Sequence, residues 1–334
     1  MPLDCQRQHF EIPAEITYLN CAFMGPFSRR VLTAGQQGLA RKSHPWSISP
    51  ADFFVDVERA RELFAQVVSG DAEGVAILPS VSYGMASAAR NLPVAAGSEI
   101  LVLAEQFPSN VYIWQDLAQR RGARIRTIPR PHDGDWTREI LAAIDERTAL
   151  AALPHCHWTD GTLVDLERVG AHLRQRGAHL VVDGCQSIGA RPFDVGRIEP
   201  DFVVTASYKW LLGPYSHGFA WVAPRWRTGE PLEQNWIARA NSHDFTALVR
   251  YTDEFASGAR RFDVGEVSNF GLLPATLAAL EQTLDWGVAE IQETLGRLTD
   301  RIAERAEELG LGVVPAGNRS QHLIGLRLGN RDPR

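Results

Sequence analysis

Two charged residues stand directly after apolar runs that predict buried β-strands, and both carry side chains suited to chemistry. Asp183 ends the run HLVVD, and Lys209 follows the run DFVVTASY. A carboxylate or an ammonium group beside a buried strand is costly unless an opposite charge or a ligand meets it. Taken alone, such an aspartate is usually a turn or helix-cap residue. A lone lysine of this kind usually extends its ammonium group to the surface.

The spacing of these two residues favours a shared role. Lys209 follows Asp183 by 26 residues, which is the length of one helical crossover between neighbouring parallel strands. Both side chains are therefore expected at the same edge of a sheet, where ligands of such sheets bind. Apolar surroundings favour the neutral amine that imine formation needs, and an aspartate can hold a pyridinium nitrogen. The pair predicts a pyridoxal 5′-phosphate (PLP) site in which Lys209 forms the Schiff base.

Two further segments suit the same ligand. The segment LPSVSYG joins a predicted strand to a predicted helix, and its residues Ser80, Val81 and Ser82 would place backbone N–H groups and hydroxyls at a helix N-terminus. Serine is also a common helix cap, so this signal is weak by itself. Phe107, in the segment FPSN, could stack on a flat heteroaromatic ring, although plain core packing explains it equally well.

Strand-like and helix-like segments alternate through most of the chain. This rhythm predicts an α/β fold with a mostly parallel seven-stranded sheet between helices. A long helical pattern from about Leu272 to Leu309, broken near Gly287, leads into a smaller C-terminal α+β domain with one strand at Leu323–Leu328. We expect an N-terminal arm at the active site (1–30), a large domain (31–270) and a short, incomplete-looking small domain (271–334). The seven strands are expected at Val75–Leu78, Glu99–Leu103, Arg124–Ile128, Leu150–Leu153, His179–Val182, Asp201–Thr205 and His217–Val222.

Composition narrows the class of protein. A net charge of −6 and a pI near 5.9 argue against nucleic acid or an anionic membrane as the main partner. No apolar run is long enough to span a bilayer, and the N-terminus lacks a signal-peptide pattern. The four cysteines form no CxxC pair and no zinc pattern, so we expect no metal and a cytoplasmic location.

With these motifs in order, the chain resembles the class V aminotransferase family of fold-type I PLP enzymes. That family includes cysteine desulfurases, kynureninases and isopenicillin N epimerase-like proteins. The resemblance runs from Tyr18-Leu19-Asn20 to about Ala279, and its strongest parts are DGCQS and ASYKW. The segments FPSN, PSVS and PHCHWTDG also look like family segments around the cofactor.

The resemblance implies a role for each matching position. Lys209 would form the internal aldimine and move protons, while Asp183 would keep the pyridine nitrogen protonated. Gln186 would reach the phenolic oxygen of the cofactor. Ser80, Val81 and Ser82 would hold the phosphate, helped by Ser207 or Tyr208. Phe107 would stack on the face of the ring, and His157 would lie near its other edge. A lone histidine is more often structural, so His157 carries the weakest of these assignments.

Some positions depart from the family pattern. The chain has no cysteine after Cys185, which disfavours a persulfide-forming desulfurase. The family usually supplies a C-terminal arginine for the substrate carboxylate, and the chain ends at Arg334 before the expected place. Arg239, Arg260, Arg261 or a missing segment could serve instead, and Asn20 is a further substrate candidate.

The resemblance also implies a homodimer with shared active sites. The segment RRFDVGEVSN looks like the family segment that reaches the phosphate of the neighbouring subunit. Glu266 stands there where many relatives have threonine, and its carboxylate would repel a phosphate. A backbone N–H or Ser268 would then have to make the contact. Without the resemblance, the charges of this segment suggest a solvated loop with internal ion pairs.

The leading interpretation is a PLP-dependent enzyme that acts on an amino acid or amine, by aminotransferase or C–S lyase chemistry. An epimerase-type enzyme of the same family and a non-catalytic PLP-binding paralogue remain as alternatives. The sequence leaves the substrate open, because these reactions share their first steps.

Overall fold

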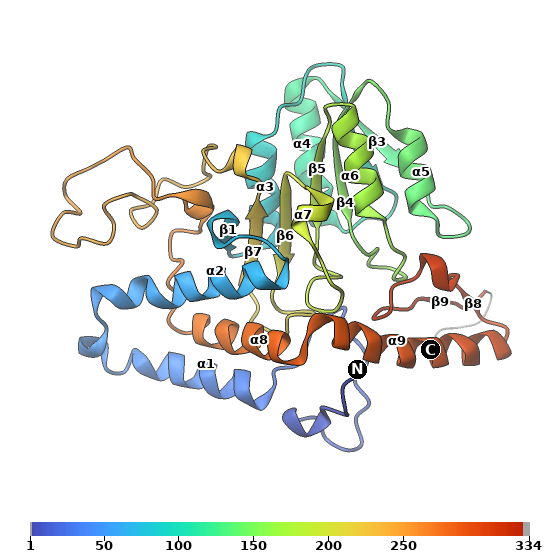
Figure 1. Ribbon diagram of the computed structural model, residues 1–334, viewed down its shortest axis with the longest axis horizontal. Coiled ribbons are helices and arrows are strands. Elements are labelled where there is room, and N and C mark those ends of the chain that lie inside the picture. The colour runs from blue at the N-terminus through green and yellow to red at the C-terminus, as the bar shows by residue number, and fades with distance from the viewer. Residues whose placement is uncertain (1, 330–334) are drawn as a thin grey trace.

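The computed structural model describes residues 2–329 and is built around one seven-stranded sheet (Figure 1). The strand order is β1-β7-β6-β5-β4-β2-β3. Only β7 runs antiparallel to its neighbours, so the predicted mostly parallel sheet is confirmed. The strands are β1 (Val75–Leu78), β2 (Glu99–Leu103), β3 (Arg124–Ile128), β4 (Thr148–Pro154), β5 (His179–Asp183), β6 (Phe202–Ala206) and β7 (Gly218–Val222).

Helices cover both faces of this sheet. One core contains apolar residues of α3 and α4, and the other contains those of α2 and of α5 to α8. The helices are α1 (Arg29–Arg41), α2 (Val55–Val67), α3 (Val81–Asn91), α4 (Tyr112–Arg121), α5 (Trp136–Ala143), α6 (Leu166–Gln175), α7 (Val195–Ile198), α8 (Leu273–Trp286) and α9 (Val288–Glu308). Within residues 2–329, none of the helices is long and apolar enough to cross a membrane.

The parallel register brings the two predicted chemical residues to one edge. Strands β5 and β6 pair directly, with Asp183 opposite Val204. Asp183 is the last residue of β5, and Lys209 follows the end of β6 by three residues. Because β4, β5 and β6 run parallel, their carboxyl ends lie at the same edge of the sheet and face one common space.

The C-terminal part departs from the sheet. Helix α8 packs on α1 and α2, and Gly287, with φ of +77°, separates α8 from α9 as expected. Of the strand expected at Leu323–Leu328, only β9 (Leu326–Arg327) pairs, with β8 (Gly312–Val313). The expected strand does not begin at Leu323, because the Leu323 N–H donates to Ser320 Oγ at 3.2 Å across a bend of the chain. The last residues of the expected small domain, 330–334, lie outside the described part.

Candidate active site

A cavity of about 300 Å³ lies at the carboxyl edge of the sheet. Segments at the carboxyl ends of five different strands line it. Pro79 to Ser82 follow β1, Gln106 and Phe107 follow β2, Cys156 and Trp158 follow β4, Asp183 ends β5 and is followed by Cys185 and Gln186, and Tyr208 and Lys209 follow β6. The cavity therefore collects most of the residues expected at a cofactor, from segments far apart in the chain.

Asp183 is buried, with 6% of its surface exposed. Its Oδ1 accepts a hydrogen bond from the Cys185 N–H at 3.0 Å, and it forms no ion pair with any residue between 2 and 329. Burial raises the pKa of this carboxyl group, and the Cys185 N–H and the charge of Lys209 oppose that rise. A buried carboxylate with so little compensation fits a cationic ligand group such as a pyridinium.

Lys209 is equally enclosed, at 7% exposure. Its Nζ lies 5.3 Å from the centre of the Phe107 ring and 5.7 Å from that of Tyr208. No carboxylate of the described chain pairs with it. The N-terminal arm packs on its backbone, because a Cβ at Gly25 would lie 2.2 Å from the Lys209 carbonyl oxygen. The arm thus holds the backbone from which the Lys209 side chain enters the cavity.

The first turn of α3 forms one end of the cavity. Ser80 caps this helix, and its Oγ accepts the Tyr83 N–H at 3.2 Å. Val81 and Ser82 are the first helical residues, whose N–H groups have no partner within the helix. This end of the cavity has the donors that a phosphate needs.

Tyr208 and Ser207 differ in their access to this cavity. Tyr208 lines it and packs on Tyr215 with ring centres 4.6 Å apart, and burial raises its pKa to about 12. Ser207 does not line the cavity, because its hydroxyl is held by the carbonyls of Pro214 and His217, at 2.6 and 2.8 Å. The expected help of Ser207 at the phosphate is therefore not supported, since this hydroxyl closes the turn before β7.

Gln186 lines the cavity and is held at both ends of its amide. Its Nε2 donates to the Ala22 carbonyl at 3.0 Å, and its Oε1 accepts the Trp210 Nε1–H at 2.8 Å. The first contact ties the N-terminal arm to the site. One N–H of the amide remains for a ligand oxygen.

His157 does not lie where the resemblance implied. It is fully buried, its Nε2 lies 3.1 Å from the Ala104 carbonyl, and its ring stacks on Trp136. Cys156 and Trp158 line the cavity instead, because side chains alternate along an extended segment. Trp158 meets Phe107 edge to face at 5.6 Å. The resemblance implied the histidine of the segment PHCHWTDG, whereas the structure brings the tryptophan one position later into the cavity.

The candidate arginines are engaged elsewhere. Arg260 pairs with Glu58 and Glu73, and Arg261 donates to the Thr228 and Gly229 carbonyls. Arg239 lies over the Phe255 ring. Neither these three arginines nor Asn20, Glu266 and Ser268 line the cavity. Within the described chain, Arg261 Nε is buried without a hydrogen-bond partner, whereas Arg260 is held by two carboxylates.

Comparison with known proteins identifies the chain. The sequence pattern of the family named Aminotransferase class-V matches residues 42–332. The chain belongs to this family. Its members depend on PLP, so the expected family and cofactor are confirmed and the chain is a PLP-dependent enzyme of the transferase or lyase type.

Individual relatives carry several activities. The chain is 27% identical to isopenicillin N epimerase of Streptomyces clavuligerus, over 85% of this chain and 73% of that protein. It is 29% identical to a cysteine desulfurase of Salmonella agona, over 84% of this chain and 68% of that protein. These family members share ancestry and differ in the reaction that their names give.

Solved structures confirm the fold. A C-DES mutant with glycine covalently linked to its PLP cofactor superposes with a TM-score of 0.82 at 22% identity, over 95% of this chain and 84% of that one. An apo cysteine desulfurase of Thermococcus onnurineus NA1 superposes with a TM-score of 0.83 at 19% identity, over 98% of this chain and 82% of that one. The expected fold type I of PLP enzymes is thus present.

Proposed function

We propose that this chain acts on an amino acid or amine through Lys209, by aminotransferase or C–S lyase chemistry. The observation that carries the proposal is that Asp183 and Lys209, both buried, face one cavity without an ion-pair partner in residues 2–329. Two unpaired buried charges of opposite sign are expensive in an empty site, and PLP offers a counterpart to each.

Each residue would have a separate task. When bound, PLP supplies an electron sink that stabilises negative charge at the substrate Cα. Lys209 would hold the cofactor aldehyde, and its freed amine would then carry a proton to or from the substrate. Asp183 would keep the pyridine nitrogen protonated. The first turn of α3 would hold the phosphate, and Phe107 would cover the ring.

The cysteines in the cavity favour this chemistry over persulfide formation. Burial raises the pKa of Cys156 to about 12, and it raises that of Cys185 well above the ordinary thiol value. Neither thiol forms the thiolate that would attack a sulfur atom at neutral pH. A desulfurase of the persulfide-forming kind is therefore disfavoured, although relatives carry that name.

A screen of amino acids with the PLP-loaded protein tests the proposal. An absorbance change on substrate addition means that the amino acid engages the cofactor. Keto acid formed only with an amino acceptor indicates transamination, and sulfur release without an acceptor indicates C–S lysis. Loss of optical activity alone would favour the epimerase alternative. A spectrum that no amino acid or amine changes would favour the non-catalytic paralogue and contradict the proposal.

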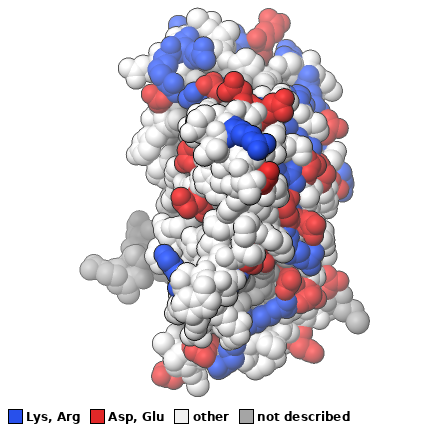
Figure 2. Space-filling view, turned by 90° about the vertical axis from the view of Figure 1, so that its left-hand side faces the viewer, with Lys and Arg blue, Asp and Glu red and all other residues white. Residues whose placement is uncertain are grey.

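We further propose that the protein works as a homodimer with shared active sites. Large apolar side chains are exposed in the α1–α2 connection and in the loop that follows β7, among them Trp46, Val249 and Tyr251. Figure 2 shows this side of the molecule, with broad uncharged areas between scattered charges. Such areas are typical of surfaces that another protein covers.

Mixing two inactive variants tests this sharing. Glu266 is exposed, so Glu266→Trp should leave its own subunit folded and block a neighbouring site that the segment reaches. Mixed dimers of Lys209→Ala and Glu266→Trp should regain one intact site and part of the activity. No recovery despite demonstrated subunit exchange would overturn the shared site.

A further inference from the structure

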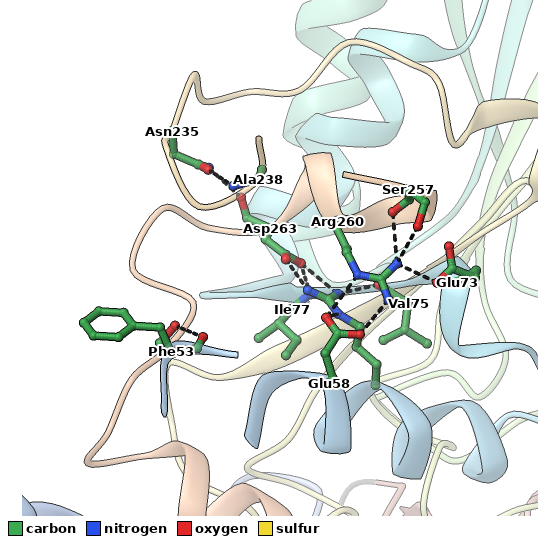
Figure 3. Close-up of polar contacts among 12 residues, drawn as sticks. Phe53, Glu58, Glu73, Val75, Ile77, Asn235, Ala238, Ser257, Arg260 and Asp263 are labelled. Carbon is green, nitrogen blue, oxygen red and sulfur yellow. Dashed lines mark hydrogen bonds and ion pairs between the residues drawn. The ribbon is translucent and has the colours of Figure 1, made fainter. Parts of the chain in front are cut away.

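Strand β1 lies at the edge of the sheet, and two side chains and one backbone N–H satisfy its outer backbone groups (Figure 3). The Val75 carbonyl accepts Arg61 Nη1–H at 2.6 Å. The Ile77 N–H donates to Asp263 Oδ1 at 2.8 Å, and the Ile77 carbonyl accepts the Val264 N–H at 3.1 Å. An edge strand normally presents unpaired groups on this side. Here Arg61 and Asp263 take the place of a further strand.

Arg61 and Asp263 also bind each other. Both are buried, at 1% and 3% exposure, and the two guanidinium Nη atoms meet the two carboxylate oxygens. Glu58 joins the pair, accepting from Arg61 Nε at 3.1 Å and from Arg260. A buried ion pair is stable only when the remaining donors and acceptors are satisfied, and this network satisfies them.

This network stands next to the phosphate end of the cavity. Ile77 is followed by Leu78 and Pro79, and then by Ser80, the cap of α3. The Asp263 contact is therefore three residues from the helix start. Neither Arg61 nor Asp263 lines the cavity, so any influence on a ligand acts through β1.

We propose that Arg61 and Asp263 are positioning residues for the phosphate group of the cofactor. They fix where β1 ends, and so where the first turn of α3 presents its N–H groups. Hydrogen bonds to a phosphate depend steeply on distance and direction, so a small shift of this turn weakens them. The inference rests on the proposed use of PLP in this cavity, and it assigns a role to residues outside that cavity.

The test compares two ligands that differ only in the phosphate. Apoprotein with Asp263→Asn is titrated with PLP and with pyridoxal, with binding followed by protein fluorescence. Asparagine keeps the shape but cannot pair with the Arg61 charge. PLP affinity should fall about tenfold, the scale at which outer contacts tune a ligand site. Pyridoxal affinity should stay within about twofold, as expected for an independent part of the site. The ratio of the two affinities cancels effects on Lys209.

Asp201→Asn is the matched control. Asp201 is 2% exposed, accepts a strand N–H from Leu180 at 2.8 Å, and pairs with Arg225. It precedes β6, at the end of the sheet away from the cavity. Both aspartates accept a strand N–H while buried, so Asp201→Asn should lower stability while the affinity ratio stays as in wild type.

The outcomes separate this inference from the proposed function. A ratio that falls in Asp263→Asn and not in Asp201→Asn supports the positioning role. An unchanged ratio in Asp263→Asn, or equal losses for both ligands, overturns it while the proposed function stands. Failure of wild-type protein to bind PLP at all overturns both. If Asp263→Asn does not fold, Arg61→Lys gives the same readout, because lysine keeps the charge and loses the two-pronged contact.

Discussion

Asp183 and Asp263 are both buried at the ends of their segments, yet their surroundings differ completely. Asp263 meets the guanidinium group of Arg61 and a strand N–H, whereas Asp183 has the Cys185 N–H and, as its cation within the described residues, only Lys209 beyond ion-pair distance. For Asp263, the Arg61 charge and the Ile77 N–H offset part of the cost of burying the carboxylate, although burial still raises its pKa. For Asp183 the missing contribution has to come from a ligand. Both carboxylates are buried, so the presence of an ion-pair partner distinguishes the structural Asp263 from Asp183, the proposed ligand-binding group.

The largest expected effect comes from the unpaired region. Lys209→Ala should abolish borohydride fixation of PLP to the chain and lower turnover by more than about a thousandfold, because no other lysine of residues 2–329 lines the cavity. Mass spectrometry of the reduced protein checks this result. Lys42→Ala is the matched control, since Lys42 and Lys209 are the two lysines of the chain. A reduced adduct on Lys42 would sink the assignment.

Asp183→Asn should have the second-largest effect on turnover. The amide cannot stabilise a protonated pyridine nitrogen, so turnover should fall by about a hundredfold while PLP still binds. Steady-state kinetics together with the absorbance spectrum of the bound cofactor provide the measurement. Turnover close to that of wild type would leave Asp183 with a structural role only.

The stability of the apoprotein should depend on Asp263 more than on Asp183, which is the opposite of their expected effects on turnover. Asp263→Ala leaves the Arg61 charge buried with less compensation, so the free energy of unfolding should fall by about 3–5 kcal/mol. Asp183→Asn removes a poorly compensated charge and should leave that free energy unchanged or higher by up to about 1 kcal/mol. Urea unfolding of both apoproteins measures the difference. Equal losses would show that the two carboxylates are not distinguished by pairing.

A smaller effect concerns His217, a buried residue of the cavity wall whose ring nitrogens have no hydrogen-bond partner in the described chain. Burial lowers its pKa from 6.5 to about 4. Between pH 6.5 and 4, His217 is protonated in the unfolded chain but neutral in the folded chain. The free energy of unfolding is therefore unaffected by protonation of this residue above pH 6.5, and it falls as the pH is lowered toward 4. When the pH is lowered from 7 to 5, the free energy of unfolding of His217→Gln should fall by about 1–2 kcal/mol less than that of wild type. Identical pH profiles of urea unfolding for the variant and wild type would contradict the assignment.

The sheet and its two central chemical residues could be predicted because their signals are local. Short apolar runs predict the strands, and the spacing from Asp183 to Lys209 matches one crossover. The cap at Ser80 follows from the same logic, since a hydroxyl residue stands between a strand and a helix. In these cases the neighbouring residues are sufficient to decide the structure.

Other features depend on neighbours that are distant in the chain. Arg260 binds Glu58 and Glu73, which are 202 and 187 residues away, so its adjacent charges gave no sign of this pairing. Ser207 is held by carbonyls across a turn, and His157 faces the core because of the phase of an irregular extended segment. By itself the sequence determined the fold class and the Asp183–Lys209 pair, through periodicity and spacing. Only the tertiary structure decided which charged and polar groups stay free for a ligand, because that depends on every partner that folding brings within hydrogen-bond distance.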